Sequence, residues 1–417
     1  MTTMSERPGP VVVVGASLAG LRAVEGVRRA GFKGELILVG AEEHLPYNRP
    51  PLSKDLLTGM VEHNALGLCT EEHLADLGVT LRLGTPATGL DLGAREVVLD
   101  GARLPFGSLL VTTGSRPAAL PHGGAPPRGV HLLRTVDDAL ALRDDLSRAR
   151  DVVVVGAGFV GAEVASSAAE LGARVTVVEA APAPLARALG PTIGEVCGRL
   201  HGLHGVTLRC GAGVAALEGT PAVTSVRLTD GTRLPADVVV VGIGVRPDTD
   251  WLEGSGLDLS DGVVCDETLN AGHPGIWAAG DVATWTNPLY GRRMRLQAWT
   301  AASEQALAAA RNAVADTPKP CSVVPYFWSD QYGKRLAALG VPGEADEPHV
   351  VGDLEGLRFV SLHPDGDRIG MVFALDRPDL IMKFRRLVMT RAPFGEAVEL
   401  AERLVAEPAH EEQGVRS

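Results

Sequence analysis

Two glycine-rich turns are the parts of this sequence whose residue types and spacing most clearly suggest chemistry. Residues 11–20 read VVVVGASLAG, and residues 152–161 repeat the pattern as VVVVGAGFVG. In a G-x-G-x-x-G turn the first glycine makes a tight bend, the second admits a phosphate, and the third lets the following helix pack on the strand. Backbone N–H groups at the start of that helix bind a pyrophosphate. Each turn therefore predicts a dinucleotide site.

The second turn contains all three glycines, Gly156, Gly158 and Gly161. A carboxylate that accepts hydrogen bonds from the ribose hydroxyls is expected about 20 residues further along, at the end of the next strand. Glu179 stands there. Because a carboxylate repels a 2′-phosphate and no arginine follows it directly, the sequence favours NADH over NADPH.

The first turn departs from the pattern, because Ser17 replaces the middle glycine between Gly15 and Gly20. Serine is small and its backbone N–H still donates, so the prediction of a dinucleotide site stands. A hydrolase nucleophile would require G-x-S-x-G, but Ala19 occupies the last position of that motif. The sequence therefore does not support a hydrolase at Ser17.

Further candidate residues stand where other strands end. Glu42, with Glu43 as the less favoured alternative, is the expected ribose acid of the first turn. Residues 112–114 (TTG) end a predicted strand, and Gly280 and Asp281 end another. Asp281 is a candidate for holding the hydroxyls of a flavin's ribityl chain, or is an ordinary helix cap. Two dinucleotide sites in one chain indicate FAD and a nicotinamide that passes it a hydride.

The elements that must position these residues are two β-α-β units. Each combines an apolar, β-branched strand, a glycine turn, an alanine-rich helix and a second apolar strand, which is typical of a buried parallel sheet. The predicted strands are residues 11–14, 35–39, 109–112, 152–155, 174–178, 237–241 and 275–279, and the predicted helices are residues 21–30, 162–171 and 301–315.

From about residue 321 the pattern changes to strand-like segments at 357–362 and 368–374 and a helix at 396–406. The prediction is an α/β chain with two Rossmann-like dinucleotide-binding domains and a small α+β domain at the C-terminal end.

The composition excludes several classes of function. The formal net charge is −12, from 39 Lys and Arg against 51 Asp and Glu, which argues against nucleic acid or an anionic membrane as the main partner. No apolar run approaches the roughly 18 residues of a membrane-spanning helix. Residues 1–10 lack the apolar core of a signal peptide. We therefore expect a cytoplasmic protein without membrane insertion.

The cysteines and histidines predict no metal site. The five cysteines are Cys69, Cys197, Cys210, Cys265 and Cys321. They are far apart and form no C-x-x-C pair, which is typical of a reducing compartment and excludes both structural zinc and a dithiol active site. His201 and His204 have the spacing of metal ligands, but no third ligand stands nearby, so we predict a turn there.

Four segments carry a resemblance to a known family: residues 45–54 (LPYNRPPLSK), 133–135 (LRT), 277–282 (WAAGDV) and 325–333 (PYFWSDQYG). Over essentially the whole chain, the sequence resembles the flavoprotein ferredoxin reductases that serve cytochrome P450s and ring-hydroxylating dioxygenases. The resemblance implies a glutathione-reductase-like architecture. The implied parts are a split FAD domain at 1–116 and 245–320, an NAD domain at 117–244, a C-terminal domain at 321–408 and a disordered tail at 409–417. The Pro/Gly-rich stretch at 116–129, between the two β-α-β units, is a candidate linker.

The same resemblance implies that Lys54 lies near the flavin N5 atom, paired with Glu163, where a cation stabilises the reduced flavin. The candidate FAD residues are Gly15, Ser17, Leu18, Ala19, Gly20, Glu42, Arg49, Lys54, Ala87, Thr113, Gly114, Arg134, Gly280, Asp281 and Trp299. The candidate nicotinamide residues are Gly156, Gly158, Phe159, Val160, Gly161, Glu163, Glu179, Gly242, Ile243 and Gly244. The chain departs from the family at Asn48, at Ala41 and at residues 297–298, where the family commonly has acidic residues or a Glu-His pair.

The cysteine pattern indicates how electrons leave the flavin. Related disulfide reductases use a cysteine pair, and related oxidases use one cysteine near Tyr47, but the nearest cysteine here is Cys69. Since a flavin can accept two electrons and release them singly, we expect single-electron transfer to an iron–sulfur ferredoxin. The alternatives are a rubredoxin or Rieske-component reductase, and a slow NADH-binding flavoprotein of the apoptosis-inducing-factor type. The oligomeric state stays open.

An acidic ferredoxin requires a local basic face on an acidic reductase. The candidate docking residues are Arg292, Arg293, Arg295, Trp328, Lys334 and Arg335. A run of like charges is also common on ordinary solvated faces. Trp299 and Trp328 are candidates for the electron exit route, or are packed core residues.

Overall fold

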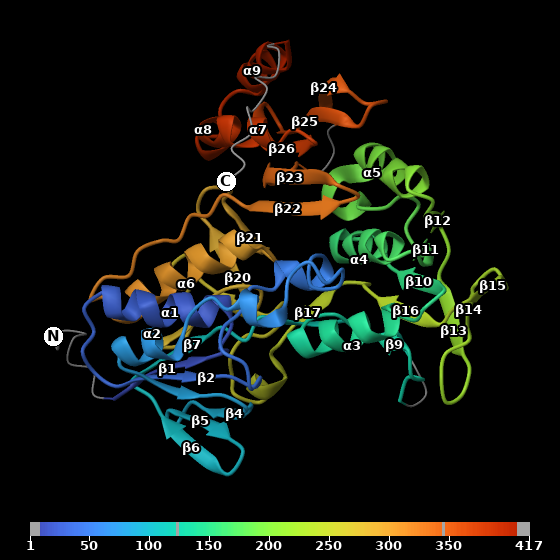
Figure 1. Ribbon diagram of the computed structural model, residues 1–417. Helices are drawn as coiled ribbons and strands as arrows, with labels where there is room; N and C mark the ends of the chain where they lie inside the picture. Colours follow the sequence, from blue (N-terminus) through green and yellow to red (C-terminus); the bar gives the residue numbers. More distant parts are fainter. Residues whose placement is uncertain (1–8, 122–124, 344–346, 407–417) are drawn as a thin grey trace. The chain divides into compact units, whose positions relative to one another are not determined.

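The computed structural model describes residues 9–121, 125–343 and 347–406, which form two compact units (Figure 1). The first unit contains Met1–Pro184 and His201–Val323, and the second contains Leu185–Leu200 and Val324–Ser417. The tail predicted at 409–417 and the middle of the predicted linker, residues 122–124, lie outside the described residues. The domain boundaries expected from the family resemblance stay a prediction.

A five-stranded parallel sheet forms the first half of unit one, in the order β19-β7-β1-β2-β3. Its strands are β1 (Val11–Val14), β2 (Leu36–Val39), β3 (Val79–Arg82), β7 (Ser108–Val111) and β19 (Ile276–Ala278). The helices α1 (Leu18–Arg29) and α6 (Trp299–Ala313) pack on this sheet and lie side by side (Figure 1). Every residue of β1, β2 and β7 is buried, which explains their apolar, β-branched composition.

A second parallel sheet has the order β12-β11-β10-β16-β9. Its strands are β9 (Val130–His131), β10 (Asp151–Val155), β11 (Arg174–Glu179), β12 (Thr207–Cys210) and β16 (Val238–Val241). The helix α4 (Phe159–Glu170) packs against β10, β11 and β16, and α3 (Val136–Leu146) precedes β10 in the chain. The units β1-α1-β2 and β10-α4-β11 are the two β-α-β units predicted from the sequence.

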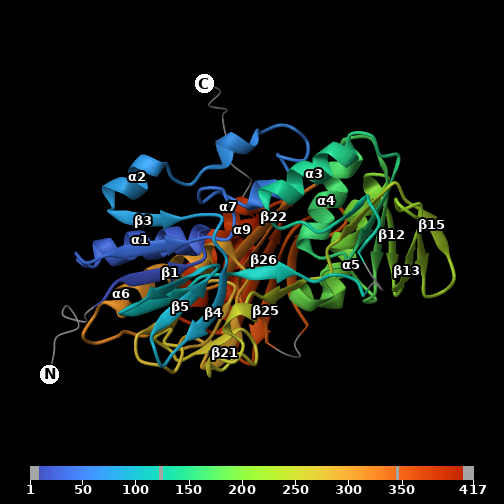
Figure 2. The same ribbon diagram turned by 90° about the horizontal axis from the view of Figure 1, so that it is seen from below.

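Smaller elements complete the first unit. The antiparallel sheets are β4 (Ala87–Asp91), β5 (Glu96–Leu99) and β6 (Ala102–Pro105); β13 (Val214–Glu218), β14 (Ser225–Leu228) and β15 (Arg233–Pro235); and the ribbon of β8 (Ser115–Pro117) with β17 (Val245–Pro247). A mixed sheet contains β18 (Val263–Cys265), β20 (Ala283–Asn287) and β21 (Arg292–Arg295). The short helices are η2 (Pro50–Ser53), η3 (His63–Leu66), α2 (Glu71–Asp76) and η4 (Asp250–Leu252). The β13–β15 sheet lies beside β12 in both views (Figures 1 and 2).

The second unit is built on an antiparallel sheet in the order β22-β23-β26-β25-β24. Its strands are β22 (Tyr326–Gln331), β23 (Lys334–Gly340), β24 (His349–Asp353), β25 (Arg358–Asp365) and β26 (Arg368–Leu375). Its helices are α7 (Pro378–Ile381), η5 (Met382–Phe384), α8 (Arg385–Met389) and α9 (Phe394–Ala406), together with most of α5 (Ala186–Leu203). The predicted α/β fold class with a small α+β part is confirmed.

Three local expectations are wrong. Arg116 and Pro117, expected in a linker, belong to β8 and pair with β17. His201, expected in a turn, lies in the last turn of α5 beyond the kink at Gly190 and is buried, whereas His204 lies in the turn that follows this helix. α1 and α4 begin three residues earlier than expected, since the last residues of each glycine turn are already helical. The helix N-termini consequently lie directly at the turns.

Two kinds of feature are absent from the residues that the structure describes. These residues contain no helix long and apolar enough to cross a membrane. They also contain no group of three or more His, Cys, Asp or Glu side chains that could hold a metal ion.

The close approach of backbone to backbone sets the geometry of both glycine turns. A Cβ atom at Gly20 would overlap the carbonyl oxygen of Gly15, and one at Gly161 would overlap the carbonyl oxygen of Gly156. A Cβ atom at Gly158 would meet nothing within 4 Å. The third glycine of each turn therefore serves helix–strand packing, whereas the middle position of the second turn faces open space.

This difference predicts unequal effects on stability. Gly161→Ala should destabilise the protein by about 1–3 kcal/mol, because backbone must move to accommodate the methyl group. Gly158→Ala should leave the free energy of unfolding within about 0.5 kcal/mol of the parent. Urea unfolding followed by circular dichroism measures both, and equal stabilities of the two variants would contradict the packing role of Gly161.

A buried histidine predicts acid sensitivity of the second unit. His363 in β25 is 4% exposed, its Nε2 lies 3.0 Å from the Ser361 hydroxyl, and burial lowers its pKa to about 4 from the ordinary 6.5. Between these two values the unfolded chain binds a proton that the folded chain does not, so stability falls as the pH falls. We expect a loss of up to ~3 kcal/mol across this window. His363→Gln should reduce that loss in urea titrations at neutral and acidic pH, and an unchanged pH dependence would contradict the assignment.

Candidate functional site

A cavity opens where β1, β2 and β7 end, at the carboxyl edge of the first parallel sheet. Ligands of open α/β sheets bind at this edge. The lining includes six residues predicted to contact FAD: Gly15, Ser17, Glu42, Arg49, Ala87 and Thr113. Glu43, the less favoured ribose acid, is exposed and does not line the cavity.

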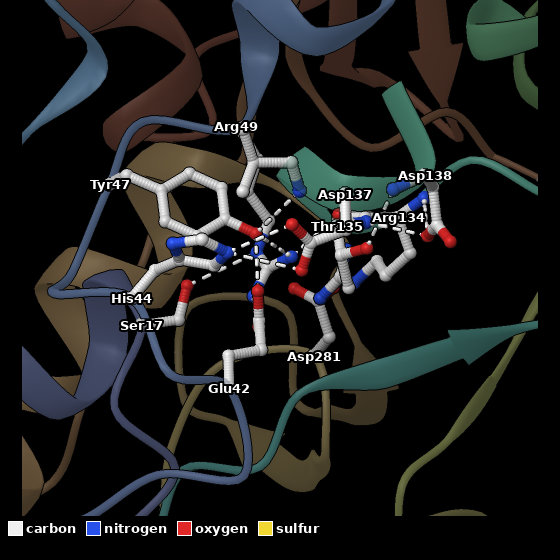
Figure 3. A network of polar contacts seen from close by, with 11 residues as sticks. Ser17, Glu42, His44, Tyr47, Arg49, Arg134, Thr135, Asp137, Asp138 and Asp281 are labelled. Atoms are coloured by element: carbon white, nitrogen blue, oxygen red, sulfur yellow. Dashed lines mark hydrogen bonds and ion pairs between the residues drawn. The ribbon is translucent and has the colours of Figure 1, made fainter. Parts of the chain in front are cut away.

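The Arg49 guanidinium binds residues from three separate segments of the chain (Figure 3). Its Nε donates to the Ser17 hydroxyl at 3.2 Å, and its Nη2 donates to Glu42 Oε1 at 2.5 Å. Its Nη1 donates to the backbone carbonyl of Arg134 at 2.5 Å. The guanidinium thus ties the first glycine turn and the expected ribose acid to a segment 85 residues further along the chain.

Tyr47 supports the same carboxylate. Its hydroxyl donates to Glu42 Oε2 and accepts a hydrogen bond from the backbone N–H of Val136 at 3.0 Å. The Arg49 guanidinium lies 5.0 Å from the centre of the Tyr47 ring, and burial raises the pKa of the Tyr47 hydroxyl. Because Val136 begins α3, this hydrogen bond ties the start of that helix to the segment after β2.

A second set of polar contacts links Arg134, Asp281 and Ser115. Arg134 Nη2 lies 3.4 Å from Asp281 Oδ2, which also accepts a hydrogen bond from the Ser115 hydroxyl at 2.9 Å. Burial lowers the pKa of the Arg134 guanidinium, and the charge of Asp281 opposes that shift. Asp281 caps no helix, since it lies in the turn before β20, so the helix-cap alternative from the sequence is wrong.

The first glycine helix and the segment after β19 lie close together. The Ala19 Cβ would be 3.3 Å from a Cβ atom at Gly280, whose N–H donates to Gln305 Oε1 at 2.8 Å. Gln305 is fully buried, and its Nε2 has no hydrogen-bond partner among the described residues. A buried donor without an acceptor is costly. The fold therefore offers an unused hydrogen-bond donor beside Ala19 and Gly280.

Two backbone hydrogen bonds hold the Glu179 carboxylate beside the second glycine turn. Glu179 Oε2 accepts from the N–H of Ala157 at 2.7 Å, and Oε1 accepts from the N–H of Ala181 at 2.8 Å. Both contacts fix the carboxylate at the end of β11, beside the turn. The apolar side chains of Val160 and Ile243 are 46% and 40% exposed.

The remaining predicted residues of this turn are also gathered there. A Cβ at Gly156 would overlap the carbonyl of Gly242, and a Cβ at Gly242 would be 3.6 Å from Gly161. Phe159 is the first residue of α4, and Gly244 follows Ile243 with a φ of +112°.

Lys54 and Glu163 form an ion pair between the two halves of the first unit. Lys54 Nζ lies 3.0 Å from Glu163 Oε1, and the two side chains are 14% and 7% exposed. Lys54 follows η2 and Glu163 lies on α4, directly after the second glycine turn. The ion pair implied by the family resemblance is thus present in the structure. Removal of one partner from a buried ion pair strongly destabilises a folded protein.

A hydrogen bond accounts for one of the three departures from the family pattern. Asn48 Oδ1 accepts a hydrogen bond from Trp299 Nε1 at 3.0 Å, so an amide oxygen serves where an aspartate oxygen is common. Ala41 is exposed. The structure shows no contact that explains the change at Gln297 and Ala298.

No cysteine of the chain resembles a redox centre. All five are described, and all are free thiols. Burial raises the pKa of Cys197, Cys265 and Cys321 to about 12, and burial together with Glu25 raises the pKa of Cys69. Protonated, buried thiols are poor nucleophiles. These properties do not suit a disulfide relay.

Carboxylates neutralise part of the positive charge of the candidate docking residues. Arg295 pairs with Asp261 at 2.9 Å, Lys334 with Asp376 at 2.7 Å and Arg335 with Asp330 at 2.7 Å. Arg292 is half-buried and Arg293 is exposed. Trp328 stacks on Tyr326, with ring centres 5.9 Å apart, and is half-buried. Arg293 is the predicted docking residue most available to a partner.

Comparison with known proteins assigns the family. The family model described as "Pyridine nucleotide-disulphide oxidoreductase" matches residues 9–306, and that described as "Reductase C-terminal" matches residues 326–405. The chain belongs to the pyridine nucleotide-disulphide oxidoreductase family. Membership makes it an NAD(P)H-dependent flavin oxidoreductase, and it implies binding of FAD and a pyridine nucleotide.

Individual relatives are similar over nearly the whole chain. The ferredoxin–NAD(+) reductase component of the anthranilate 1,2-dioxygenase system of Burkholderia cepacia is 37% identical, over 92% of this chain and 95% of that protein. Putidaredoxin reductase of Pseudomonas putida is 34% identical over 92% of each chain. The crystal structure of the covalent putidaredoxin reductase–putidaredoxin complex matches with a TM-score of 0.89 and 33% identity, over 96% of this chain and 100% of that chain. The resemblance to ferredoxin reductases predicted from sequence motifs is confirmed.

The family's cofactors fit the geometry of this oxidoreductase. The open space at Gly158 is a feature that a bound nucleotide phosphate would fill, and the cavity lined by Gly15, Ser17, Glu42 and Arg49 offers a glycine turn, a hydroxyl and charged groups to the polar parts of FAD. Three residues that hydrogen-bond to predicted site residues are not among the predicted residues themselves: Gln305, Ser115 and Ser53. The residue before Lys54 is the only one of these with a sequence signal, because Ser53 belongs to the motif at 45–54.

Loss of the Tyr47 hydroxyl should weaken cofactor retention. Tyr47→Phe removes a donor from Glu42 and an acceptor from the Val136 N–H, and unmade hydrogen bonds of this kind cost about 1–3 kcal/mol. We expect FAD to dissociate roughly tenfold more readily, since about 1.4 kcal/mol corresponds to that factor. Flavin fluorescence on dialysis measures the loss, and full retention of FAD would contradict the role of this hydrogen-bond network.

Proposed function

We propose that this oxidoreductase takes a hydride from NADH onto FAD and passes single electrons to an iron–sulfur ferredoxin that serves a P450 or another oxygenase. The similarity to ferredoxin reductases over more than nine-tenths of the chain supports the acceptor class. Under this proposal the strands β1, β2, β3, β7 and β19 belong to the FAD domain, and β9–β12 and β16 belong to the NAD domain.

The observation that carries the proposal is the ion pair of Lys54 with Glu163. It connects the segment after the first sheet, where FAD is expected, to the helix that follows the second glycine turn, where NADH is expected. Bound FAD would supply the hydride acceptor and the single-electron donor. Lys54 would present a positive charge to the flavin edge, and Glu163 would hold the ammonium group there.

The cysteines support direct transfer to an external acceptor. A disulfide relay needs a reactive thiolate next to the flavin, but the described thiols are buried or half-buried and four of them have raised pKa values. The chain therefore offers no internal carrier of that kind. The proposed acceptor is a separate protein.

The direct test is spectroscopic. The purified protein should be yellow, should bleach with NADH under anaerobic conditions, and should reduce cytochrome c only when a ferredoxin from the same genome is added. A protein that binds no flavin would contradict the proposal. Slow bleaching with a persistent charge-transfer band and no ferredoxin reduction would instead favour the slow NADH-binding class. Faster reduction of a rubredoxin or Rieske protein than of any ferredoxin would favour those acceptors.

Glu179 should determine the choice of nicotinamide. Glu179→Gln removes the negative charge that opposes a 2′-phosphate but keeps a polar group of the same length. We expect KM for NADH to rise about tenfold, because one charged hydrogen bond contributes roughly 1.5–3 kcal/mol. The preference of the enzyme for NADH over NADPH should decrease by a similar factor. Steady-state ferricyanide reduction with each nucleotide measures this, and an unchanged ratio would contradict the assignment.

Docking of an acidic ferredoxin should depend on Arg293. Arg293→Glu should raise KM for ferredoxin several-fold at low ionic strength and leave NADH–ferricyanide activity unchanged, since opposite charges steer the encounter. Lys33→Glu is the matched control, because it changes the net charge equally at another exposed position of the same unit. Equal effects of the two reversals, or loss of ferricyanide activity with Arg293→Glu, would contradict a docking role.

A further inference from the structure

We propose that Ser53 is a positioning residue for the Lys54–Glu163 pair and that Ser167 holds Ser53 in place for this task. The inference rests on the proposed function. It adds two hydroxyl groups, from two different halves of the first unit, that control where the Lys54 ammonium stands during hydride transfer from NADH.

The two oxygens of Glu163 are bound by consecutive residues. Oε1 accepts from Lys54 Nζ at 3.0 Å, and Oε2 accepts from the Ser53 hydroxyl at 2.5 Å. Taken as whole residues, Ser53 is 5% exposed and Glu163 is 6% exposed, so both groups are shielded from water. A carboxylate held at one oxygen only can rotate about its last bond. The second contact fixes the plane of the carboxylate and therefore the direction in which Oε1 meets the ammonium group.

Ser167 fixes the backbone of Ser53. Its hydroxyl donates to the Ser53 carbonyl at 2.8 Å, and its side chain is buried. Glu163 and Ser167 are four residues apart on α4, so they lie on one face of the helix. That face therefore holds Ser53 twice, through its hydroxyl and through its carbonyl.

The chain around Ser53 is stiff in a way that suits this role. Two prolines, Pro50 and Pro51, begin η2 and lock its φ angles. Lys54 then leaves the helical conformation, with φ −129° and ψ −105°, and the two side chains bind different oxygens of Glu163. A lysine side chain is a point charge on a flexible four-carbon stem, which makes its position depend on the group that binds it.

The chemistry makes the position of this charge important. The hydride leaves NADH as two electrons with one proton, and the flavin gains negative charge that a nearby ammonium group stabilises. Misplacement of a charged group by about 1 Å can cost up to ~100-fold in rate. Ser53 touches neither cofactor in this proposal, and it acts only through Glu163 and Lys54.

The test is stopped-flow reduction of the FAD-loaded protein by NADH under anaerobic conditions. Ser53→Ala should lower the limiting rate constant of flavin reduction about tenfold, a modest part of the ~100-fold effect of misplacement, with little change in the NADH concentration at half-saturation. Ser53→Thr, which keeps the hydroxyl, should recover most of the rate, whereas Ser53→Val should not. Ser167→Ala should lower the rate by a smaller factor.

The Lys54→Met background separates positioning from general support of the fold. If Ser53 acts through Lys54, Ser53→Ala should have no further effect on flavin reduction in Lys54→Met protein. A merely structural serine would lower the rate by the same factor in both backgrounds. Ser108→Ala is the matched control, because Ser108 is also a buried serine of the first unit whose hydroxyl donates to a backbone carbonyl, at 3.2 Å. It should lower the melting temperature without changing the rate.

The outcomes distinguish the two proposals. Fast reduction of the parent protein together with an undiminished rate in Ser53→Ala, or with equal factors in both backgrounds, would overturn the positioning role and leave the proposed function intact. Failure of NADH to reduce the parent flavin would overturn both. If Ser53→Ala does not fold, the comparison of Ser53→Thr with Ser53→Val and the Ser167→Ala variant decide the question.

Discussion

The structure depends on a backbone-to-backbone contact that only glycine permits. Gly20 lies against the carbonyl of Gly15, and Gly161 lies against the carbonyl of Gly156, so closely that a single methyl group would overlap the oxygen. These contacts place the first turn of each helix directly at the end of a buried parallel strand. Because the helix N-terminus carries unpaired N–H groups and a partial positive charge, this placement creates two sites suited to phosphates.

Polar contacts between distant segments join the two halves of the first unit that carry these sites. Arg49 and Tyr47 bind the segment at 134–136, and Lys54 and Ser53 bind the helix α4. Such contacts are directional and are wholly or partly buried, so they define one arrangement of the two halves of the first unit more strictly than apolar packing does. The proposed hydride transfer requires that arrangement, since donor and acceptor must meet at a fixed distance.

The distribution of charge is less simple than the sequence suggests. The chain carries a net charge of −12, and several cations expected to attract an acidic partner are bound to carboxylates. Ion pairing at the surface reduces the field that a partner experiences and contributes little stability. Under the proposed function, recognition of a ferredoxin would depend on exposed cations without such an ion pair, such as Arg293, and on local shape.

The sequence by itself determined the class of fold and the chemistry of the two turns. Glycines at fixed spacing after β-branched strands have few structural solutions, so the β-α-β units, the carboxylate at Glu179 and the family motifs were readable from local pattern. The helix starts and the pairing of Arg116 with β17 do not follow from the local pattern, because turn residues and short ribbons have weak local signals.

Only the tertiary structure decided which polar groups meet. Ser53 and Ser167 are 114 residues apart, and Gly280 and Gln305 are brought together by packing of α6. The partners of Asp281, and the ion pairs that neutralise Arg295 and Lys334, likewise follow from the fold. Hydrogen bonds between side chains act over about 3 Å, and such distances between remote residues are set by the packed fold and not by spacing along the chain.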